Sequence, residues 1–267
     1  MPTIPQPAGS KQPLLQDVRG GVCTLTLNRP EARNALSVAL MGALQKAIDE
    51  IARDRSVKVV VIAASGPAFC AGHDLKELRA NRGRDSVGAV FAQCSHLMLS
   101  LTRLPQPVIA KVQGVATAAG CQLVATCDLA VASRTARFAT PGVNIGLFCS
   151  TPMVALSRAV GRKQAMEMLL TGDLVGAEEA CRIGLVNRVV EPGQLDAALE
   201  ELAAKIVSKS RLVVAIGKEA FYRQLEMDLE GAYAYASQVM TNNMLAGDAE
   251  EGIDAFLEKR PPVWRDR

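Results

Sequence analysis

The chain has 267 residues, enough for one large domain or for one domain with an appendage. Hydrophobic residues make up 49% of it, so that a sizeable core can be buried. Its 30 basic and 27 acidic residues leave a net charge of +3, no run of Lys or Arg forms a basic patch, and aromatic residues are only 4%. These values give no indication of a nucleic-acid partner.

The seven cysteines are scattered, contain no C-x-x-C pair and are accompanied by only two histidines, so we predict no metal site. Their spread is typical of a reduced protein, and we expect a cytoplasmic location. Residues 1–13 are rich in proline and lack an apolar core, which predicts a flexible tail rather than a signal peptide. No apolar run approaches the ~20 residues needed to cross a bilayer, so no membrane partner is expected.

The first part of the chain alternates strands with helices. Residues 14–18 and 22–28 read as two strands, and after a polar turn Ser37 is the predicted N-cap of an amphipathic helix. Residues 57–63 form a continuous apolar run, which predicts a strand buried on both faces. A loop of small residues follows, and then a long helix over 85–102.

The stretch 108–128 combines a strand, a corner and a helix start, and it is the most informative part of the sequence. It reads as a buried strand over 108–112, a corner of small residues over 116–120 and the first turns of a buried helix over 121–127. Small residues allow another molecule to approach the backbone closely. The free N–H groups at the start of the helix lie at the positive end of its dipole, so the corner suits an oxygen that gains negative charge.

The character of the chain changes beyond Pro192. A strand at 129–133, a loop rich in Pro and Gly, and two short helices precede it, whereas four helices follow it. Asp248 and Glu251 predict a capping box at the start of the last helix. The strand–loop–helix units before Pro192 indicate stacked ββα turns rather than a solenoid of short repeats.

Five motifs carry a family resemblance, and they stand at 27–37, 66–78, 107–133, 138–152 and 170–190. In order and spacing they resemble the enoyl-CoA hydratase/isomerase (crotonase) superfamily nearly from end to end. Within it, GHDLKEL and ATAAGCQLVA are most similar to the subgroup of enoyl-CoA hydratase domain-containing protein 3.

The resemblance implies an α/β fold, a crotonase-like ββα spiral core with an all-helical C-terminal trimerisation region. We therefore expect a tail over 1–13, the spiral core over 14–193 and a helical oligomerisation region over 194–267. The implied partners are further copies of the chain, in a homotrimer or a dimer of trimers.

The resemblance also implies an acyl-CoA thioester as ligand, with coenzyme A as part of the substrate and no bound cofactor. Two backbone N–H groups of the family polarise the thioester carbonyl in an oxyanion hole. They fall here on His73 and Ala119, and Ala71, Gly72 and Gly120 beside them are expected to line the substrate. Each donor of this kind contributes roughly 10²–10³ in rate.

Further substrate contacts follow from the resemblance. The segment with Glu31, Ala32 and Arg33 is expected beside the pantetheine and adenine, and Lys259 is expected to meet the nucleotide of a neighbouring subunit. Arg33 and Lys259 can each pair with a phosphate. The alternative, that each is a solvated surface cation, is equally open.

The chain departs from the family at both acid/base positions. The two glutamates that handle water in the hydratases are replaced by Gln122 and Gly142. An amide cannot accept a proton near neutral pH, and glycine has no side chain. Losing one general acid/base group costs ~10²–10⁴ in rate, so ordinary hydration of enoyl-CoA is expected to be weak.

Other residues are weaker candidates for the missing chemistry. The imidazole of His73 could act as an acid or base, but a side chain turned from the substrate is the favoured interpretation. The thiol of Cys149 could act as an acid or nucleophile, but a small buried core thiol is the favoured interpretation. Asp74 is predicted to be a helix N-cap, and Asp128 to secure the entry of a strand.

Three functions stay open at this point. The first is an acyl-CoA enzyme that works through its oxyanion hole by isomerisation, thioester hydrolysis or decarboxylation. The second is a non-catalytic or regulatory acyl-CoA-binding protein. The third is a residual hydratase that uses a water held by Gln122. A nucleotide-binding domain is disfavoured because neither G-x-G-x-x-G nor a P-loop motif is present.

Overall fold

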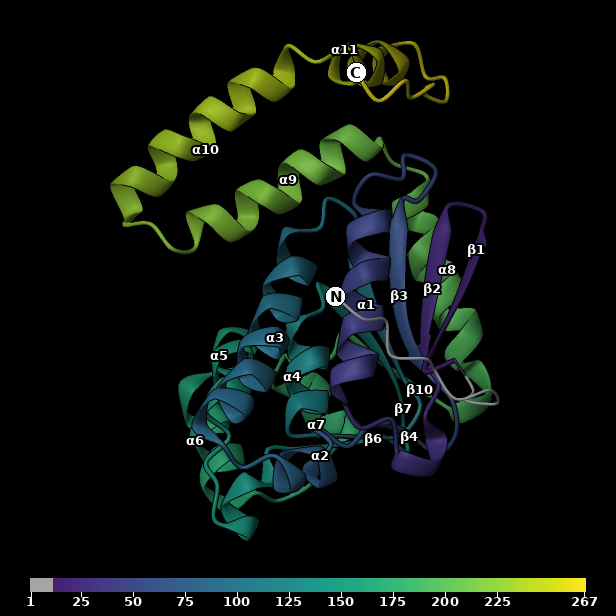
Figure 1. Ribbon diagram of the computed structural model, residues 1–267. Helices are drawn as coiled ribbons and strands as arrows, with labels where there is room; N and C mark the ends of the chain where they lie inside the picture. The colour runs from purple at the N-terminus through teal and green to yellow at the C-terminus, as the bar shows by residue number, and fades with distance from the viewer. Residues whose placement is uncertain (1–11) are drawn as a thin grey trace, which may run out of the picture.

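The computed structural model describes residues 12–267, which form two sheets covered by helices (Figure 1). The larger sheet has the strand order β1-β2-β3-β5-β7-β10, and the smaller has the order β4-β6-β8-β9. In the larger sheet only β1 and β2 are antiparallel, and in the smaller only β8 and β9 are. The strands are β1 Leu14–Arg19, β2 Val22–Leu27, β3 Val59–Ala64, β4 Ala68–Cys70, β5 Val108–Val112, β6 Val115–Thr117, β7 Leu129–Ser133, β8 Arg137–Ala139, β9 Val175–Gly176 and β10 Arg188–Val190.

Each turn of the chain adds one strand to each sheet before a helix returns it. β3 and β4, β5 and β6, and β7 and β8 are such pairs, and helices follow each of them. Parallel neighbours require such crossover connections. The predicted ββα spiral is therefore confirmed. The helices are α1 Val38–Ile51, α2 Leu75–Ala80, α3 Arg84–Arg103, α4 Ala119–Thr126, α5 Ser150–Ala159, α6 Arg162–Thr171, α7 Ala177–Arg182, α8 Leu195–Val207, α9 Arg211–Gln224, α10 Leu229–Met244 and α11 Gly247–Leu257, with short 3₁₀ turns η1 Pro30–Ala32, η2 Pro141–Ile145 and η3 Pro192–Gln194.

Both faces of the larger sheet are covered. On β3, Val59 and Val61 pack with Leu199 of α8, whereas Val60 and Ile62 belong to the main core that includes α1, α3 and α4. Side chains of a strand alternate between faces, so a strand between two helical layers must be apolar throughout. This arrangement explains the continuous apolar run that predicted β3.

The chain beyond η3 is helical, as expected from its composition. No whole residue of α9 or α10 is fully buried, and the two helices lie as a pair at one end of the molecule (Figure 1), although the side chain of Lys218 on α9 reaches into the body. The division at 193 and the oligomerisation role of 194–267 stay predictions. Of the expected tail 1–13, residues 1–11 lie outside the described part. Within residues 12–267, no helix combines the length and the apolar character that crossing a membrane demands.

The predicted capping box at the last helix is wrong. α11 follows Ala246, which provides no side-chain cap. Asp248 is buried and accepts hydrogen bonds from the Ser210 hydroxyl at 2.5 Å and from the N–H of Arg265 at 2.8 Å. The carboxylate therefore ties the start of α9 to the C-terminal residues. Glu251 instead pairs with Arg260 at 2.7 Å.

Candidate functional site

The corner before α4 is held in an unusual backbone conformation. Ala118 has φ +50°, in the left-handed region that L-residues rarely adopt. Its N–H donates to the carbonyl of Ala139 at 2.9 Å, and its carbonyl accepts from the N–H of Gln122 at 3.0 Å. The first bond continues the ladder of β6 with β8, and the second opens the helix. The chain thus changes from strand to helix within one residue, and backbone strain of this kind is concentrated at functional sites.

The N–H of Ala119 is the first of the helical turn that this corner begins. Within residues 12–267, no protein group accepts a hydrogen bond from it. Helix geometry accounts for this, since the first N–H groups of a helix have no intrahelical partner. The group is available to a ligand oxygen.

The N–H of His73 is turned outward by a single bridge to another loop. Leu36 forms an isolated parallel bridge with His73, in which the Leu36 N–H donates to Gly72 at 2.7 Å and the Asp74 N–H donates to Leu36 at 3.3 Å. In such a bridge the neighbours of His73 face Leu36, so its own N–H faces away. Across the described residues it too has no acceptor.

Two glycines allow the two loops to meet backbone against backbone. Gly72 has φ +96°, and a Cβ there would stand 2.9 Å from Cβ of Ala118 and 3.3 Å from N of Ala119. A Cβ on Gly120 would overlap the carbonyl of Cys70. Glycine is therefore required at both positions. The contact of Gly72 with Ala119 brings the two predicted donors, from loops 46 residues apart, to one corner.

The imidazole of His73 is packed rather than hydrogen-bonded. Its ring meets Phe91 edge to face, with centroids 5.2 Å apart, and both ring nitrogens are buried without a protein partner in the described chain. Burial lowers the pKa of the imidazole, so the ring is neutral at physiological pH. From the sequence, a ring turned away from the substrate was the favoured interpretation, and these contacts do not test whether the ring takes part in chemistry.

Gln122 is the fourth residue of α4, with 4% of its surface exposed. Its Oε1 is buried without a hydrogen-bond partner among residues 12–267, and so is Oγ1 of the fully buried Thr140. Thr140 follows Ala139, whose carbonyl accepts from Ala118. Sequence reasoning missed Thr140, because a lone threonine before a proline carries no catalytic signal. Both groups are neutral polar groups, and neither can serve as a general base.

The space at Gly142 is occupied. A Cβ on this residue would stand 2.7 Å from the carbonyl oxygen of Leu147 and 2.9 Å from Sγ of Cys149, and the Leu147 N–H donates to the Gly142 carbonyl at 2.9 Å. The loop after η2 therefore folds back over the position of the second glutamate. Sequence comparison alone indicated only a missing side chain, whereas the loop also leaves no room for one. Cys149 is buried, and this burial raises the pKa of its thiol, so that it stays protonated at neutral pH.

The predicted nucleotide-side residues are only partly brought together. Glu31 and Arg33 are exposed around η1, Ala32 is half-buried, and the Ala71 N–H donates to the carbonyl of Arg33 at 3.0 Å. The loop of η1 thus lies directly beside the strand that leads to His73. Lys259 is exposed after α11, which Figure 1 draws at the opposite end of the molecule from α2 and β4.

Both predicted structural aspartates are confirmed. Asp74 caps α2 by accepting from the Lys76 N–H at 3.1 Å, and it pairs with Arg29 at 3.1 Å. Burial opposes ionisation of Asp74, but the hydrogen bonds from Arg29 and the backbone lower its pKa overall. Asp128 accepts from the Val108 N–H at 2.6 Å, which secures the entry of β5.

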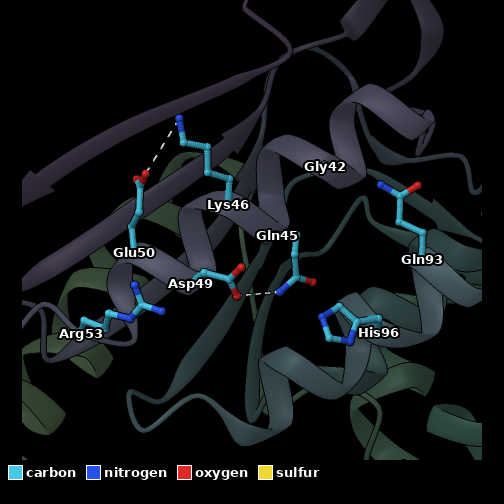
Figure 2. A pocket seen from close by; sticks show the side chains of 8 residues that line it. All are labelled: Gly42, Gln45, Lys46, Asp49, Glu50, Arg53, Gln93 and His96. Atoms are coloured by element: carbon cyan, nitrogen blue, oxygen red, sulfur yellow. Dashed lines mark hydrogen bonds and ion pairs between the residues drawn. The ribbon is translucent and has the colours of Figure 1, made fainter. Parts of the chain in front are cut away.

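Two of the cavities in the described chain lie along α3. One, of about 380 Å³, lies between α1 and α3, where Gln45, Asp49 and His96 face one another (Figure 2). Apart from Gly42, its lining residues are polar or charged, with charges of both signs, and they do not include either predicted donor. The other, of about 730 Å³, lies at the start of α3 and reaches Phe91, the ring that contacts His73. Over residues 12–267, no group of three His, Cys, Asp or Glu side chains is arranged to hold a metal.

Comparisons with known proteins agree with this architecture. The family model for enoyl-CoA hydratase/isomerase matches residues 17–267. The mitochondrial enoyl-CoA hydratase domain-containing protein 3 of Mus musculus is 52% identical over 97% of this chain and 87% of its own length. The crystal structure of an enoyl-CoA hydratase from Mycobacterium smegmatis is 60% identical, with a TM-score of 0.93 over 95% of this chain and 99% of that chain. That of the human domain-containing protein 3 is 51% identical, with a TM-score of 0.92 over 94% and 100%.

The expected cytoplasmic location is contradicted by these comparisons. The similar proteins of mouse, rat and human, and a similar probable enoyl-CoA hydratase of Dictyostelium discoideum, are named as mitochondrial. The expectation was wrong because it rested on scattered reduced cysteines. Such cysteines indicate a reducing environment and do not distinguish one reducing compartment from another.

Proposed function

Since this chain belongs to the enoyl-CoA hydratase/isomerase family, we propose that it binds acyl-CoA thioesters and polarises their carbonyl with the N–H groups of His73 and Ala119. One observation carries the proposal: two backbone donors without an acceptor among residues 12–267 lie at one corner, where Gly72 packs against Ala119. Coenzyme A is then part of the substrate, and no separate cofactor is needed.

The proposed chemistry is electrostatic. When a thioester is converted to an enolate or a tetrahedral adduct, its carbonyl oxygen gains negative charge. Donors on rigid backbone stabilise that charge without reorganisation, and the N-terminus of α4 adds the positive end of its dipole. Each donor is expected to contribute about 3 kcal/mol to the transition state.

The proton-transfer step lacks a protein carboxylate at either family position. Gln122 can orient a water but cannot take its proton, and the loop of Leu147 and Cys149 covers Gly142. Ordinary hydration should therefore be slow. A decarboxylation fits this set of residues best, because the electrons that form the enolate come from the leaving carboxylate and no protein base removes a proton.

A second candidate is a non-catalytic or regulatory acyl-CoA-binding protein. The packed loop at Gly142 favours it, since Leu147 and Cys149 occupy the space that the side chain of the family's glutamate would need. A residual hydratase, with water held by the buried amide of Gln122, is the third candidate. The neutral His73 imidazole is the first group to test as its acid or base.

We also propose that the chain assembles as a homotrimer or a dimer of trimers through 194–267. The helices of this region expose large apolar side chains, an arrangement that indicates an interface. Exposed large apolar side chains in or next to these helices include Leu229, Tyr233, Met240, Leu245, Phe256 and Leu257. Assembly could bring the exposed Lys259 of one subunit to the η1 loop of another, where Arg33 stands.

The test combines binding with turnover. Calorimetric titration with butyryl-CoA measures affinity, hydration of crotonyl-CoA measures the family reaction, and the ultraviolet spectrum of bound crotonyl-CoA reports polarisation of the carbonyl. We expect binding, a shift to longer wavelength and little hydration. Binding without the shift would support the non-catalytic candidate, brisk hydration would refute the reading of Gln122 and Gly142, and absence of binding would refute the ligand class.

A further inference from the structure

The cavity at the start of α3 has a charged mouth and an apolar wall. Its volume is about 730 Å³. It is lined by Arg82, Arg84, Asp85, Val87, Gly88, Ala89, Phe91 and Ala92. The two arginines are exposed, whereas Val87 and Phe91 are half-buried. A ligand in this cavity would therefore meet apolar surface inside and guanidinium groups at the rim.

The charges at the rim are free to meet a ligand. Among residues 12–267, no ion pair engages Arg82, Arg84 or Asp85, whereas Arg29, Arg134 and Arg260 each pair with a carboxylate. The net charge of the rim is positive. Asp85 lies in the first turn of α3, where the helix dipole stabilises its charge.

The cavity adjoins the predicted oxyanion hole. Phe91 lines it and stacks edge to face on the imidazole of His73, with centroids 5.2 Å apart. The N–H of the same residue, His73, is one of the two predicted donors. The contact of the His73 ring with Phe91 is therefore what links the cavity to the residue that carries this donor.

We propose that this cavity binds the far end of the acyl chain and selects chains that end in a carboxylate, so that the preferred ligands are ω-carboxyacyl thioesters. This inference rests on the function proposed above. A guanidinium binds a carboxylate through two parallel hydrogen bonds, a geometry that an unsubstituted chain end cannot use. The apolar wall accommodates the methylene groups between the thioester and the carboxylate.

The test compares ligands of equal carbon number by calorimetry: glutaryl-CoA against pentanoyl-CoA, and adipyl-CoA against hexanoyl-CoA. Two partly exposed ion pairs of ordinary strength correspond to tighter binding of the dicarboxylic ligand by about fivefold to tenfold. Because the pairs are exposed, the preference should shrink when the salt concentration is raised to about 0.5 M.

The variant Arg82→Gln/Arg84→Gln is expected to bring the ratio of the two affinities close to one. Arg79→Gln, which removes an exposed arginine of α2 outside the cavity lining, serves as the matched control and should leave the ratio as in the wild type. A melting curve for each variant checks that it is folded.

Three results would overturn parts of this reasoning, and they can be told apart. Equal affinity of the wild type for both members of each pair refutes selection of a carboxylate. An equal loss for both ligands in the double variant assigns the arginines to the phosphates of coenzyme A instead, which also refutes it. Failure of all four thioesters to bind refutes the proposed function itself.

Discussion

The C-terminal helical region should depend on one buried cation, Lys218 of α9. Only 6% of its side chain is exposed. Its ammonium donates to the carbonyls of Leu101 and Gln106, at 3.0 Å each, and pairs with Asp128 at 2.7 Å. All three protons are thereby used. Asp128 also accepts from the hydroxyl of Tyr222 at 2.8 Å, so the cluster joins α9 to the end of α4.

The perturbation is Lys218→Met, which keeps the length of the side chain and removes its charge. Asp128 then keeps only two neutral donors for a largely buried carboxylate, and two buried carbonyls lose their partner. Removing one partner of a buried ion pair costs ~3–5 kcal/mol, and we take this range to include the cost of leaving the two carbonyls without a donor. We therefore expect the free energy of unfolding to fall by about 4 kcal/mol.

Urea unfolding at fixed protein concentration measures this loss, because the stability of an oligomer depends on concentration. The double variant Lys218→Met/Asp128→Asn should recover part of it, since no uncompensated charge then remains. Lys205→Met, which breaks an exposed pair with Glu201, is the control and should change little. A loss below about 1 kcal/mol for Lys218→Met would refute the anchoring role.

Three further predictions concern the site. Gly120→Ala should destabilise the fold by about 3 kcal/mol and abolish acyl-CoA binding, because its Cβ would overlap the Cys70 carbonyl; a normal melting temperature would contradict the geometry. Gly142→Glu should gain no crotonyl-CoA hydration and should melt earlier than Gln122→Glu, since Leu147 and Cys149 fill the space; a stable, active variant would contradict this. In alkylation at pH 8 followed by mass spectrometry, half-buried Cys181 should react before Cys121 and Cys149. Burial raises the pKa of Cys121 to about 12 and that of Cys149 above its usual range, so both thiols stay protonated at pH 8. Their labelling should therefore become faster as the pH is raised. Labelling of Cys149 as fast as that of Cys181 would refute this prediction.

The sequence by itself determined the features that depend on neighbouring residues. Ser37 and Asp74 were predicted to be N-caps, and each accepts a hydrogen bond from the first turn of its helix. The apolar run of β3 indicated burial on both faces, which the two helical layers supply. Cap chemistry and strand periodicity are local properties, so composition and spacing suffice to predict them. The order and spacing of the motifs likewise indicated the spiral.

Only the tertiary structure decided the features that join distant parts of the chain. Asp248 was predicted to cap a helix with Glu251, yet it binds Ser210 and the C-terminal residues. Asp128 was expected to secure a strand, and its partner Lys218 lies five helices later in the chain. Residue spacing also did not predict the loop that covers Gly142, or that the His73 ring nitrogens have no hydrogen-bond partner within residues 12–267. Local spacing predicts where an element begins. The contacts of a side chain depend on how the elements pack together, and the spacing of residues in a single sequence does not predict that packing.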